Sequence, residues 1–261
     1  ILQFINKYFK LPFDIRIQVN NFILFANKPD RILAIFLWKF GLLEKNEIGI
    51  LQRIIKKNMC VLDIGANIGY YTTVLSELVG NNGSVHAFEP EKNNYRILSK
   101  VLRKNKIINT HIYNYAVSDT NEIGELYVSK INSGDNRLNS KTNIHETYKI
   151  TKINLDDFMF NKGSIDFIKI DIQGGETNAL IGMQKILSSN DNLIILIELD
   201  KKMTNYADNS VSKLIDLLNK YFKFCYLVRK KNIYLENDIF NYINQKNYTY
   251  ENIIFSKKLL I

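Results

Sequence analysis

The fold of this chain is decided by the stretch Val61-Leu62-Asp63-Ile64-Gly65-Ala66-Asn67-Ile68-Gly69-Tyr70-Tyr71-Thr72. It begins as an apolar strand, predicted over 60–64, and then turns at two glycines. Apolar residues recur after the second glycine with the spacing of one helical face, which predicts a helix over 68–79; they are Tyr71, Val74, Leu75 and Leu78. The N-terminal amides of such a helix point back into the turn, where they can bind an anionic group.

A second strand, predicted over 84–88, is followed by Glu89 and Pro90. A carboxylate at this strand end, about 20 positions after the last glycine of the turn, is where nucleotide-binding α/β folds hold the two hydroxyls of a ribose. A plainer interpretation is that the glycines only turn a strand into a helix, with Asp63 as a cap and Glu89 solvated. Because Asp63 and Glu89 end two adjacent strands, we favour a site for a ligand that carries a ribose.

Asn67 decides between the ribose ligands. It stands where the dinucleotide fingerprint G-x-G-x-x-G has its middle glycine, and the chain has no Gly-Lys-Ser or Gly-Lys-Thr of a P-loop. S-adenosylmethionine remains, because its ribose suits Glu89, its carboxylate suits helix amides, and its ammonium and sulfonium favour an anion such as Asp63. The predicted cofactor-binding residues are Asp63, Gly65, Ala66, Asn67, Gly69, Tyr71, Thr72, Glu89, Pro90 and Ala116.

The composition indicates one globular unit. With 261 residues, of which 46% are hydrophobic, the chain can bury one good-sized core and a small extension. Its two cysteines, Cys60 and Cys225, lie in apolar runs and are expected to be free thiols in a reducing compartment. The net charge of +9 favours acidic partners, but it follows from a bias toward Lys, Asn and Ile along the whole chain, so nucleic acid is not the expected partner.

No segment is expected to cross a membrane. The longest apolar run near the N-terminus, from Ile32 to Leu43, is interrupted by Lys39 and is too short to span a bilayer. The sequence also lacks a signal-peptide pattern, so a cytoplasmic protein is expected.

The chain is predicted to divide into an N-terminal cap, 1–58, and a ligand-binding domain, 59–261. In the cap, apolar alternation over 15–19, a turn at Asn20-Asn21 and an apolar return over 22–25 predict a hairpin, and helices are predicted over 31–40 and 44–57. Strands and helices alternate afterwards. The predicted strands are 60–64, 84–88, 111–116, 165–170, 193–198, 222–228 and 250–256, and the predicted helices are 68–79, 91–104, 176–188 and 210–220.

This alternation predicts an α/β fold with a doubly wound, mostly parallel, Rossmann-like sheet of seven strands. The stretch 226–253 has hairpin character and no good helix, so the last strand is expected to be antiparallel. A seven-stranded sheet with that ending is the usual architecture of methyltransferases.

Six motifs follow one another in a fixed order. They are Leu-Asp-Ile-Gly-Ala-Asn-Ile-Gly (62–69), Ala-Phe-Glu-Pro (87–90), Ala-Val-Ser-Asp (116–119), Asn-Leu-Asp-Asp-Phe (154–158), Ile-Lys-Ile-Asp-Ile-Gln-Gly-Gly-Glu (168–176) and Ile-Leu-Ile-Glu (195–198). In this order they resemble the FkbM family of S-adenosylmethionine-dependent methyltransferases, over roughly residues 44–200. The resemblance implies methylation of oxygen, often a hydroxyl of a sugar or of a glycosylated natural product. The chain departs from the family's usual Asp-x-Glu-Gly-Ala-Glu, since Gln173 replaces the first glutamate and Gly175 the alanine.

Methyl transfer from a sulfonium is an in-line displacement, so the protein must align donor and acceptor and remove the proton of an alcohol. Alignment can supply ~7–11 kcal/mol, and a positioned base about 10²–10⁴-fold. Carboxylates end four apolar strands and should meet at one rim of the sheet; they are Asp63, Glu89, Asp171 and Glu198. Asp171, on the central fourth strand beside the first, is the predicted base or acceptor-orienting group. It could instead cap the helix that begins near Glu176, or hold the amino end of the cofactor.

Other side chains are candidates for the same chemistry. By period-two spacing Lys169 shares a strand face with Asp171 and could hold its carboxylate ionised or orient the acceptor, although such lysines commonly extend out of a core. Glu198 is a reserve base, and His145, after the polar loop 132–137, is a further candidate base. The predicted catalytic residues are therefore Asp171, Lys169, Glu198 and His145.

The acceptor is expected to contact the same polar loop. The predicted acceptor-binding residues are Asn136, Arg137 and Gln173, and Arg137 could bind a carboxylate or phosphate in a bidentate manner. A divalent metal is not expected. Acidic residues at 156, 157, 171 and 198 have no metal-ligand spacing, and Gln173 removes a carboxylate where the family usually has one.

The leading hypothesis is an O-methyltransferase for a sugar, glycan or other small polar acceptor, free or linked to a lipid or a nucleotide. The Asn-Pro-Pro-Tyr motif of amino methylation and the Pro-Cys nucleophile of cytosine methylation are both absent, so an RNA-directed enzyme rests mainly on charge. A cofactor-binding protein without catalysis and a dinucleotide-dependent enzyme stay open as alternatives. The apolar N-terminal helices could cover their own core or meet a second chain, which would make a homodimer.

Overall fold

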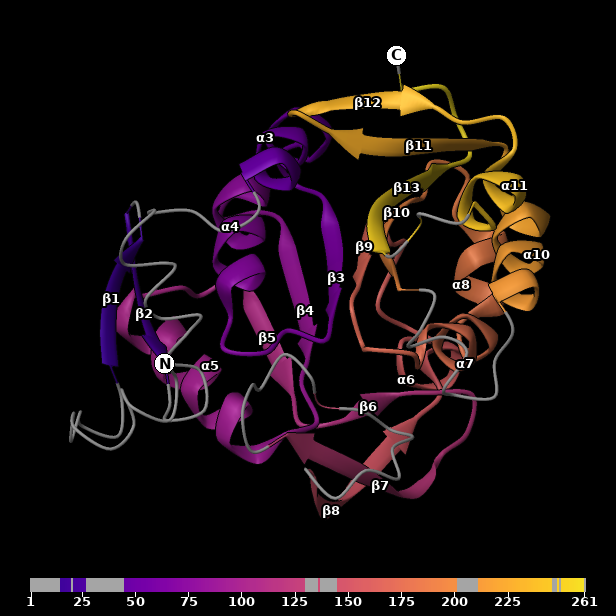
Figure 1. The fold of residues 1–261 in the computed structure, drawn as a ribbon. Coiled ribbons are helices and arrows are strands. Elements are labelled where there is room, and N and C mark those ends of the chain that lie inside the picture. The colour runs from indigo at the N-terminus through magenta and orange to yellow at the C-terminus, as the bar shows by residue number, and fades with distance from the viewer. Residues whose placement is uncertain are drawn as a thin grey trace, which may run out of the picture.

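The computed structural model describes residues 15–19, 21–26, 45–129, 136, 145–200, 211–245, 248 and 250–260. Its centre is an eight-stranded sheet with the strand order β12-β11-β13-β10-β9-β3-β4-β5 (Figure 1). The strands are β3 (Cys60–Ile64), β4 (Ser84–Phe88), β5 (Thr110–Tyr113), β9 (Phe167–Ile170), β10 (Ile194–Asp200), β11 (Phe224–Arg229), β12 (Asn232–Leu235) and β13 (Tyr250–Ser256). Strands β5, β4, β3, β9 and β10 run parallel, and β13 lies antiparallel between β10 and β11.

The expectation of seven strands was wrong by one. After Arg229 the chain reverses at Lys230 and Lys231, both with positive φ, and returns as β12 along the edge of β11. The antiparallel last strand is confirmed by the pairing of β13. The hairpin character of the stretch after Tyr226 therefore reflects an extra edge strand.

The strand predicted over 111–116 is also divided. Asn114 donates its side-chain amide to the carbonyls of Glu89 (2.9 Å) and Pro90 (3.0 Å), and at that point the chain leaves the central sheet. It continues into a separate three-stranded sheet of order β6-β8-β7, which was not predicted. The strands of this sheet are β6 (Ala116–Val117), β7 (Glu122–Ser129) and β8 (His145–Ile153).

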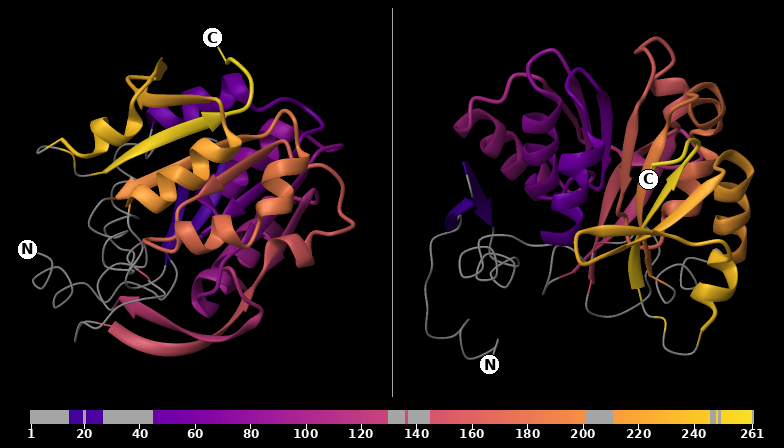
Figure 2. Two further views of the ribbon diagram at one scale, coloured as in Figure 1. Left: turned by 90° about the vertical axis from the view of Figure 1, so that its right-hand side faces the viewer. Right: turned by 90° about the horizontal axis from the view of Figure 1, so that it is seen from above.

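Helices cover both faces of the central sheet (Figures 1 and 2). Leu62 packs with α7 and α10 on one side, and Val61 packs with α3 and α4 on the other, because successive side chains of a strand point to opposite faces. The helices are α3 (Lys45–Ile54), α4 (Tyr70–Val79), α5 (Lys92–Lys104), α6 (Leu155–Phe158), α7 (Glu176–Ile181), α8 (Gln184–Ser189), α10 (Val211–Tyr221) and α11 (Ile239–Ile243).

The helix predicted over 176–188 is two helices, because the chain bends at Gly182. A Cβ added at Gly182 would lie 1.9 Å from the carbonyl oxygen of Ser118, so the close approach of these segments requires glycine. Asp156 then accepts hydrogen bonds from the amides of Lys185 (2.8 Å) and Ile186 (3.0 Å), which caps α8.

The predicted N-terminal hairpin is present as β1 (Ile15–Val19) and β2 (Phe22–Ala26), paired antiparallel. It is tied to the C-terminal end of α5, since Ile23 exchanges backbone hydrogen bonds of 2.8 Å with the side chain of Asn105. The hairpin thus packs on α5, whereas α3 packs on α4 and on strands β11 and β12. The helix predicted over 31–40 lies outside the described residues.

Both cysteines are free thiols, with Cys225 buried and Cys60 half-buried. In the parts of the chain that the structure covers, no helix combines the length and the apolar character needed to cross a bilayer.

Candidate functional site

The turn after β3 ties together the ends of three neighbouring strands. The amides of Gly65 and Ala66 both donate to the carbonyl oxygen of Phe88 at the end of β4, each over 3.0 Å. Gly65 has φ +85°, and a Cβ there would lie 1.9 Å from the carbonyl oxygen of Asp171 at the end of β9. Only glycine lets these backbones approach so closely, which brings the side chains of Glu89 and Asp171 to one place.

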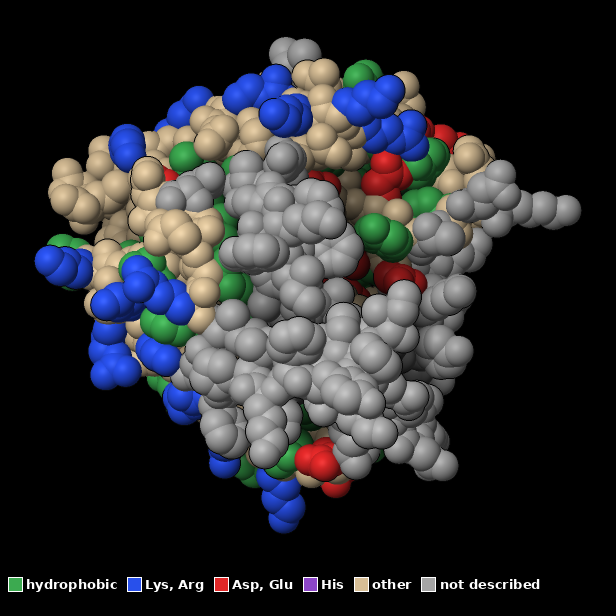
Figure 3. Space-filling model, turned by 60° about the vertical axis from the view of Figure 1, so that its left-hand side comes forward, with side chains coloured by type: hydrophobic (Ala, Val, Ile, Leu, Met, Phe, Trp, Pro, Cys, Tyr) green, Lys and Arg blue, Asp and Glu red, His purple; other side chains and the backbone are tan. Residues whose placement is uncertain are grey.

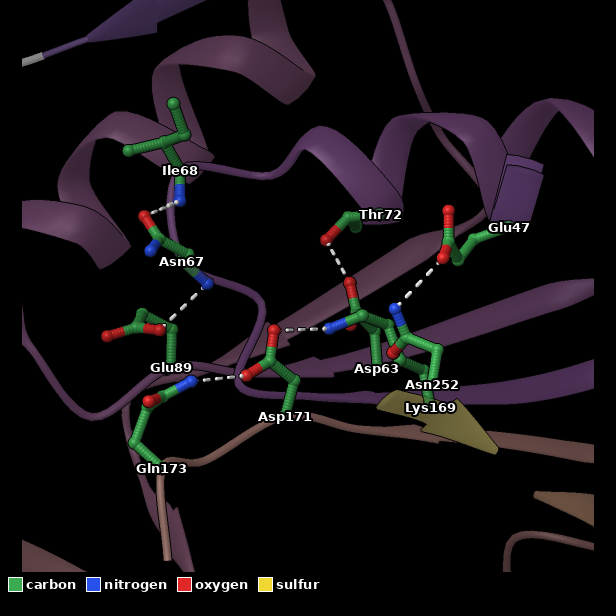
Figure 4. A network of polar contacts seen from close by, with 10 residues as sticks. All are labelled: Glu47, Asp63, Asn67, Ile68, Thr72, Glu89, Lys169, Asp171, Gln173 and Asn252. Atoms are coloured by element: carbon green, nitrogen blue, oxygen red, sulfur yellow. Dashed lines mark hydrogen bonds and ion pairs between the residues drawn. The ribbon is translucent and has the colours of Figure 1, made fainter. Parts of the chain in front are cut away.

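Glu89 is held rigidly at the end of β4 (Figure 4). One carboxylate oxygen accepts the amide of Asn67 (2.8 Å) and the other accepts the amide of Glu91 (2.9 Å). Asn67 has φ 49°, a left-handed conformation that asparagine tolerates better than most residues. Burial raises the pKa of Glu89 to about 7, in spite of these two donors.

Asp63 and Thr72 form a buried pair behind the turn. The Thr72 hydroxyl donates to Asp63 Oδ2 over 2.6 Å, and both side chains are fully buried. Burial raises the pKa of Asp63, and the charge of Lys169 offsets part of that rise. Asp63 Oδ1 has no hydrogen-bond partner among the described residues. Thr72 therefore serves Asp63, which leaves one carboxylate oxygen for another donor.

Asp171 follows the last residue of β9 and is held from two sides (Figure 4). Lys169 Nζ lies 3.3 Å from Oδ2, and Gln173 Nε2 donates to Oδ1 over 3.0 Å. Lys169 is itself buried, with Nζ 4.5 Å from the ring centre of Tyr71. The Asp171 side chain keeps 29% of its surface exposed, so the carboxylate is fixed but accessible.

A cavity opens at the C-terminal ends of β3, β4 and β9, with about 630 Å³ of empty space including its mouth. Its polar lining includes Glu89 and Asp171. Eight of the predicted site residues line it: Gly65, Asn67, Glu89, Pro90, Ala116, Asn136, Asp171 and Gln173. The position agrees with the rule that open α/β sheets bind ligands beyond the carboxyl ends of their strands.

The other predicted residues lie elsewhere. In the described part of the chain, those that do not line the cavity are Asp63, Ala66, Gly69, Tyr71, Thr72, Lys169 and Glu198. Gly69 has φ +94° and precedes α4 as its N-cap. Glu198 lies in β10, the strand next to β9, opposite Asn252 of β13. Arg137 and the side chain of His145 lie outside the described residues.

The sequence did not identify the apolar lining, which is Ile64, Phe88, Tyr115, Val117, Leu126 and Ile172. Val117 belongs to the motif at 116–119 and Tyr115 directly precedes it, so their place could have been inferred from that motif. Leu126 could not, because it belongs to the small sheet that no motif indicated.

Acidic residues near the site have structural partners. Asp156 caps α8, and Asp157 accepts a hydrogen bond of 2.9 Å from the side chain of Asn121. Within the described residues no cluster of His, Cys, Asp or Glu side chains could hold a metal ion.

Comparison with solved structures shows the same fold. A candidate rRNA methylase from Clostridium thermocellum aligns with TM-score 0.50 and 13% identity, over 82% of this chain and 97% of that one. A candidate methyltransferase from Streptococcus mutans, solved in complex with SAH, aligns with TM-score 0.50 and 12% identity, over 83% and 100%. The methyltransferase FkbM from Methylobacillus flagellatus KT aligns with TM-score 0.46 and 16% identity, over 88% and 55%. At their identities, the first two alignments establish the α/β methyltransferase-like fold alone.

None of the curated proteins matches the sequence. Residues 63–231 match the family described as the methyltransferase FkbM domain. This match confirms the resemblance drawn from the six motifs, and S-adenosylmethionine is the cofactor that it implies. Because the match covers more than half of the chain and includes every residue that lines the cavity, the chain belongs to the FkbM methyltransferase family.

Proposed function

We propose that the protein transfers the methyl group of S-adenosylmethionine to a hydroxyl of a sugar, glycan or other small polar acceptor. The observation that supports this most is the placement of two carboxylates in one cavity: Glu89 follows β4 and Asp171 follows β9, the two strands on either side of β3. The first suits a ribose, and the second suits a hydroxyl that must lose its proton.

The residues of the cavity fit the cofactor. Phe88 and Val117 offer apolar surface for an adenine, and the fixed carboxylate of Glu89 offers acceptors for the ribose hydroxyls. The unpaired oxygen of Asp63 lies behind the turn, where it favours a nearby cation or donor. When bound, the cofactor supplies a methyl group on a sulfonium, ready for in-line displacement.

Asp171 is proposed to receive the proton of the acceptor hydroxyl, or to orient that hydroxyl. Lys169 and Gln173 hold one carboxylate oxygen each, which fixes the side chain without covering it. A carboxylate accepts through about four lone-pair sites, so both oxygens can still accept from an acceptor. Alignment of donor and acceptor can lower the barrier by about 7–11 kcal/mol, whereas a positioned base raises the rate by about 10²–10⁴-fold, so alignment contributes more.

A small acceptor is preferred to RNA because the positive charge is spread out. On the face drawn in Figure 3, the Lys and Arg side chains of the described residues lie along the upper, left and lower margins and do not gather in one patch. The basic clusters of the sequence, such as Arg229-Lys230-Lys231, are short.

Calorimetric titration with S-adenosylhomocysteine, with NAD in a parallel run, tests the cofactor assignment. Micromolar binding of the first and none of the second supports it, and the reverse overturns it. Transfer of labelled methyl to methyl glycosides and to rRNA then tests the acceptor class. Asp171→Asn should lower turnover about 10²–10⁴-fold with cofactor affinity unchanged, whereas Asp157→Asn, which alters a carboxylate outside the cavity, should leave both intact. Wild-type turnover in Asp171→Asn would move the base to Glu198 or His145.

A further inference from the structure

The hairpin formed by β7 and β8 carries the same pair of side chains on both of its faces. Tyr127 donates its hydroxyl to Glu125 over 3.3 Å, and Tyr148 donates its hydroxyl to Glu146 over 2.6 Å. In each pair the residues are two positions apart, so both side chains lie on one face of their strand.

The strand register shows that only one pair faces the cavity. Tyr148 lies directly opposite Leu126, and residues opposite each other in an antiparallel pair share a face. Leu126 is 3% exposed and lines the cavity. Tyr127 follows Leu126 and lies opposite Thr147, so it points to the other face. Tyr148 and Glu146 therefore lie on the same face of the hairpin as Leu126, next to the cavity lining but not part of it.

Two further observations place Tyr148 beside the cavity mouth. The carboxylates of Glu146 and Glu91 both raise its pKa, Glu146 by a hydrogen bond and Glu91 through its negative charge. The amide of Glu91 in turn donates to Glu89, which lines the cavity. Figure 1 shows the hairpin of β7 and β8 below the ends of β3 and β4. The last residues of these two strands, Ile64 and Phe88, line the cavity.

This pair has the chemistry of a sugar-binding surface. Tyr148 keeps 46% of its surface exposed, so its ring is accessible to a ligand. An aromatic face is apolar with a negative quadrupole, and the C–H face of a pyranose is apolar with positive hydrogens, so the two surfaces stack. The hydrogen bond to Glu146 fixes both side chains, and a carboxylate accepts from several hydroxyls at once.

We propose that Tyr148 and Glu146 form an acceptor subsite that binds a pyranose ring at the mouth of the cavity. The ring stacks on Tyr148, and a hydroxyl of the sugar donates to Glu146. This inference rests on the proposed function, because it names the acceptor of that same cavity as a sugar.

Saturation-transfer NMR with a panel of neutral methyl glycopyranosides, recorded with S-adenosylhomocysteine present, tests the subsite. The wild-type protein should transfer saturation to at least one glycoside. Tyr148→Ala should weaken that glycoside's binding about fivefold or more, which is the loss expected for one aromatic face, whereas Tyr148→Phe should retain most of it. Glu146→Gln should weaken binding of the same glycoside, because it removes the charge that accepts the hydroxyl.

Tyr127→Ala is the matched control, since it removes the same side chain from the outer face of the same hairpin. Equal effects of Tyr127→Ala and Tyr148→Ala would overturn the subsite, and so would a wild-type protein that binds no glycoside. Calorimetry with S-adenosylhomocysteine separates the two proposals. If Tyr148→Ala weakens S-adenosylhomocysteine binding, the pair contacts the cofactor and the subsite is wrong, while the methyltransferase assignment stands. If the wild-type protein binds no S-adenosylhomocysteine, the proposed function itself fails.

Discussion

The state of the Glu89 carboxyl should make cofactor binding depend on pH. Burial raises its pKa to about 7, so close to half of the free protein carries a neutral carboxyl at neutral pH. Two ribose hydroxyls that donate to both carboxyl oxygens favour the ionised form, because one oxygen of the neutral form carries a proton and donates instead. Binding must therefore release the proton, and S-adenosylhomocysteine should bind more tightly as the pH rises through 7.

The magnitude follows from that single titration. The apparent dissociation constant is multiplied by one plus the ratio of neutral to ionised carboxyl, which is about 11 at pH 6 and about 1.1 at pH 8 when the pKa is about 7. The affinity should thus rise about tenfold between these pH values, or about 1.4 kcal/mol. About half a proton should be released per binding event at pH 7, because half of the carboxyls are neutral there.

Calorimetry in two buffers of different ionisation enthalpy measures both the affinity and the proton release. Glu89→Gln should bind at least tenfold more weakly at pH 8 and show a flat pH profile. Glu176→Gln is the matched control, because burial raises the pKa of Glu176 to about 7 as well, yet Glu176 does not line the cavity. A flat profile for the wild-type protein, or tighter binding at pH 6, would refute the assignment of Glu89 to the ribose. If the pH dependence of binding disappears in Glu176→Gln, the proton is released by Glu176 and not by Glu89.

Three further changes have defined outcomes. The raised pKa of Glu176 means that its stabilising contribution is complete below about pH 4.5 and is lost as the pH rises through 7, so Glu176→Gln should raise the melting temperature relative to wild type more at pH 8 than at pH 5, a difference of at most about 3 kcal/mol in the free energy of unfolding. Calorimetric melts at the two pH values measure this difference, and an equal effect at both would contradict the raised pKa. Lys169→Met leaves Asp171 without its cation and should lower the free energy of unfolding by about 2 kcal/mol, which is less than for a fully buried pair because the Asp171 side chain is 29% exposed. Urea titration measures this free energy, and an unchanged midpoint would contradict the pairing. Gly65→Ala should abolish folding or S-adenosylhomocysteine binding, whereas Gly163→Ala, at the same φ of +85° but with open space around it, should lower the free energy of unfolding by only about 1–2 kcal/mol. Equal losses of thermal stability in the two variants would mean that the backbone of Asp171 does not lie close to the turn.

Sequence reasoning placed the core elements well because their signals are local. The strand over 60–64 and the helix after Gly69 follow from apolar spacing and glycine alone, and the structure has β3 at Cys60–Ile64 and α4 at Tyr70–Val79. Glu89 and Asp171 were brought together by a general rule about strand ends, and both line the cavity. The same period-two argument placed Lys169 beside Asp171, where it forms an ion pair of 3.3 Å.

The misses arise where distant segments decide the local structure. Strand β5 ends because the Asn114 side chain binds carbonyls after β4, and the helix over 176–188 breaks because Gly182 passes against Ser118. Neither partner is near in sequence, so no periodicity could reveal it. The small sheet was missed for a related reason. Residues 146–149 of β8 are all exposed, and its buried residues are Ile150, which packs against β6 and β7, and Ile153, which packs in the main core, so the strand shows no regular alternation.

Gln173 shows what a motif alone cannot tell. The sequence marked it as a departure from the family's usual glutamate, which could mean a lost acceptor site. In the structure its φ is 51°, and that conformation directs the side-chain amide back onto Asp171 Oδ1, 3.0 Å away. A glutamate at this position would bring a second carboxylate to the same oxygen, where like charges within a few ångströms repel or must share a proton. The amide instead donates a hydrogen bond that fixes the Asp171 carboxylate, so the departure is compatible with the role proposed for Asp171.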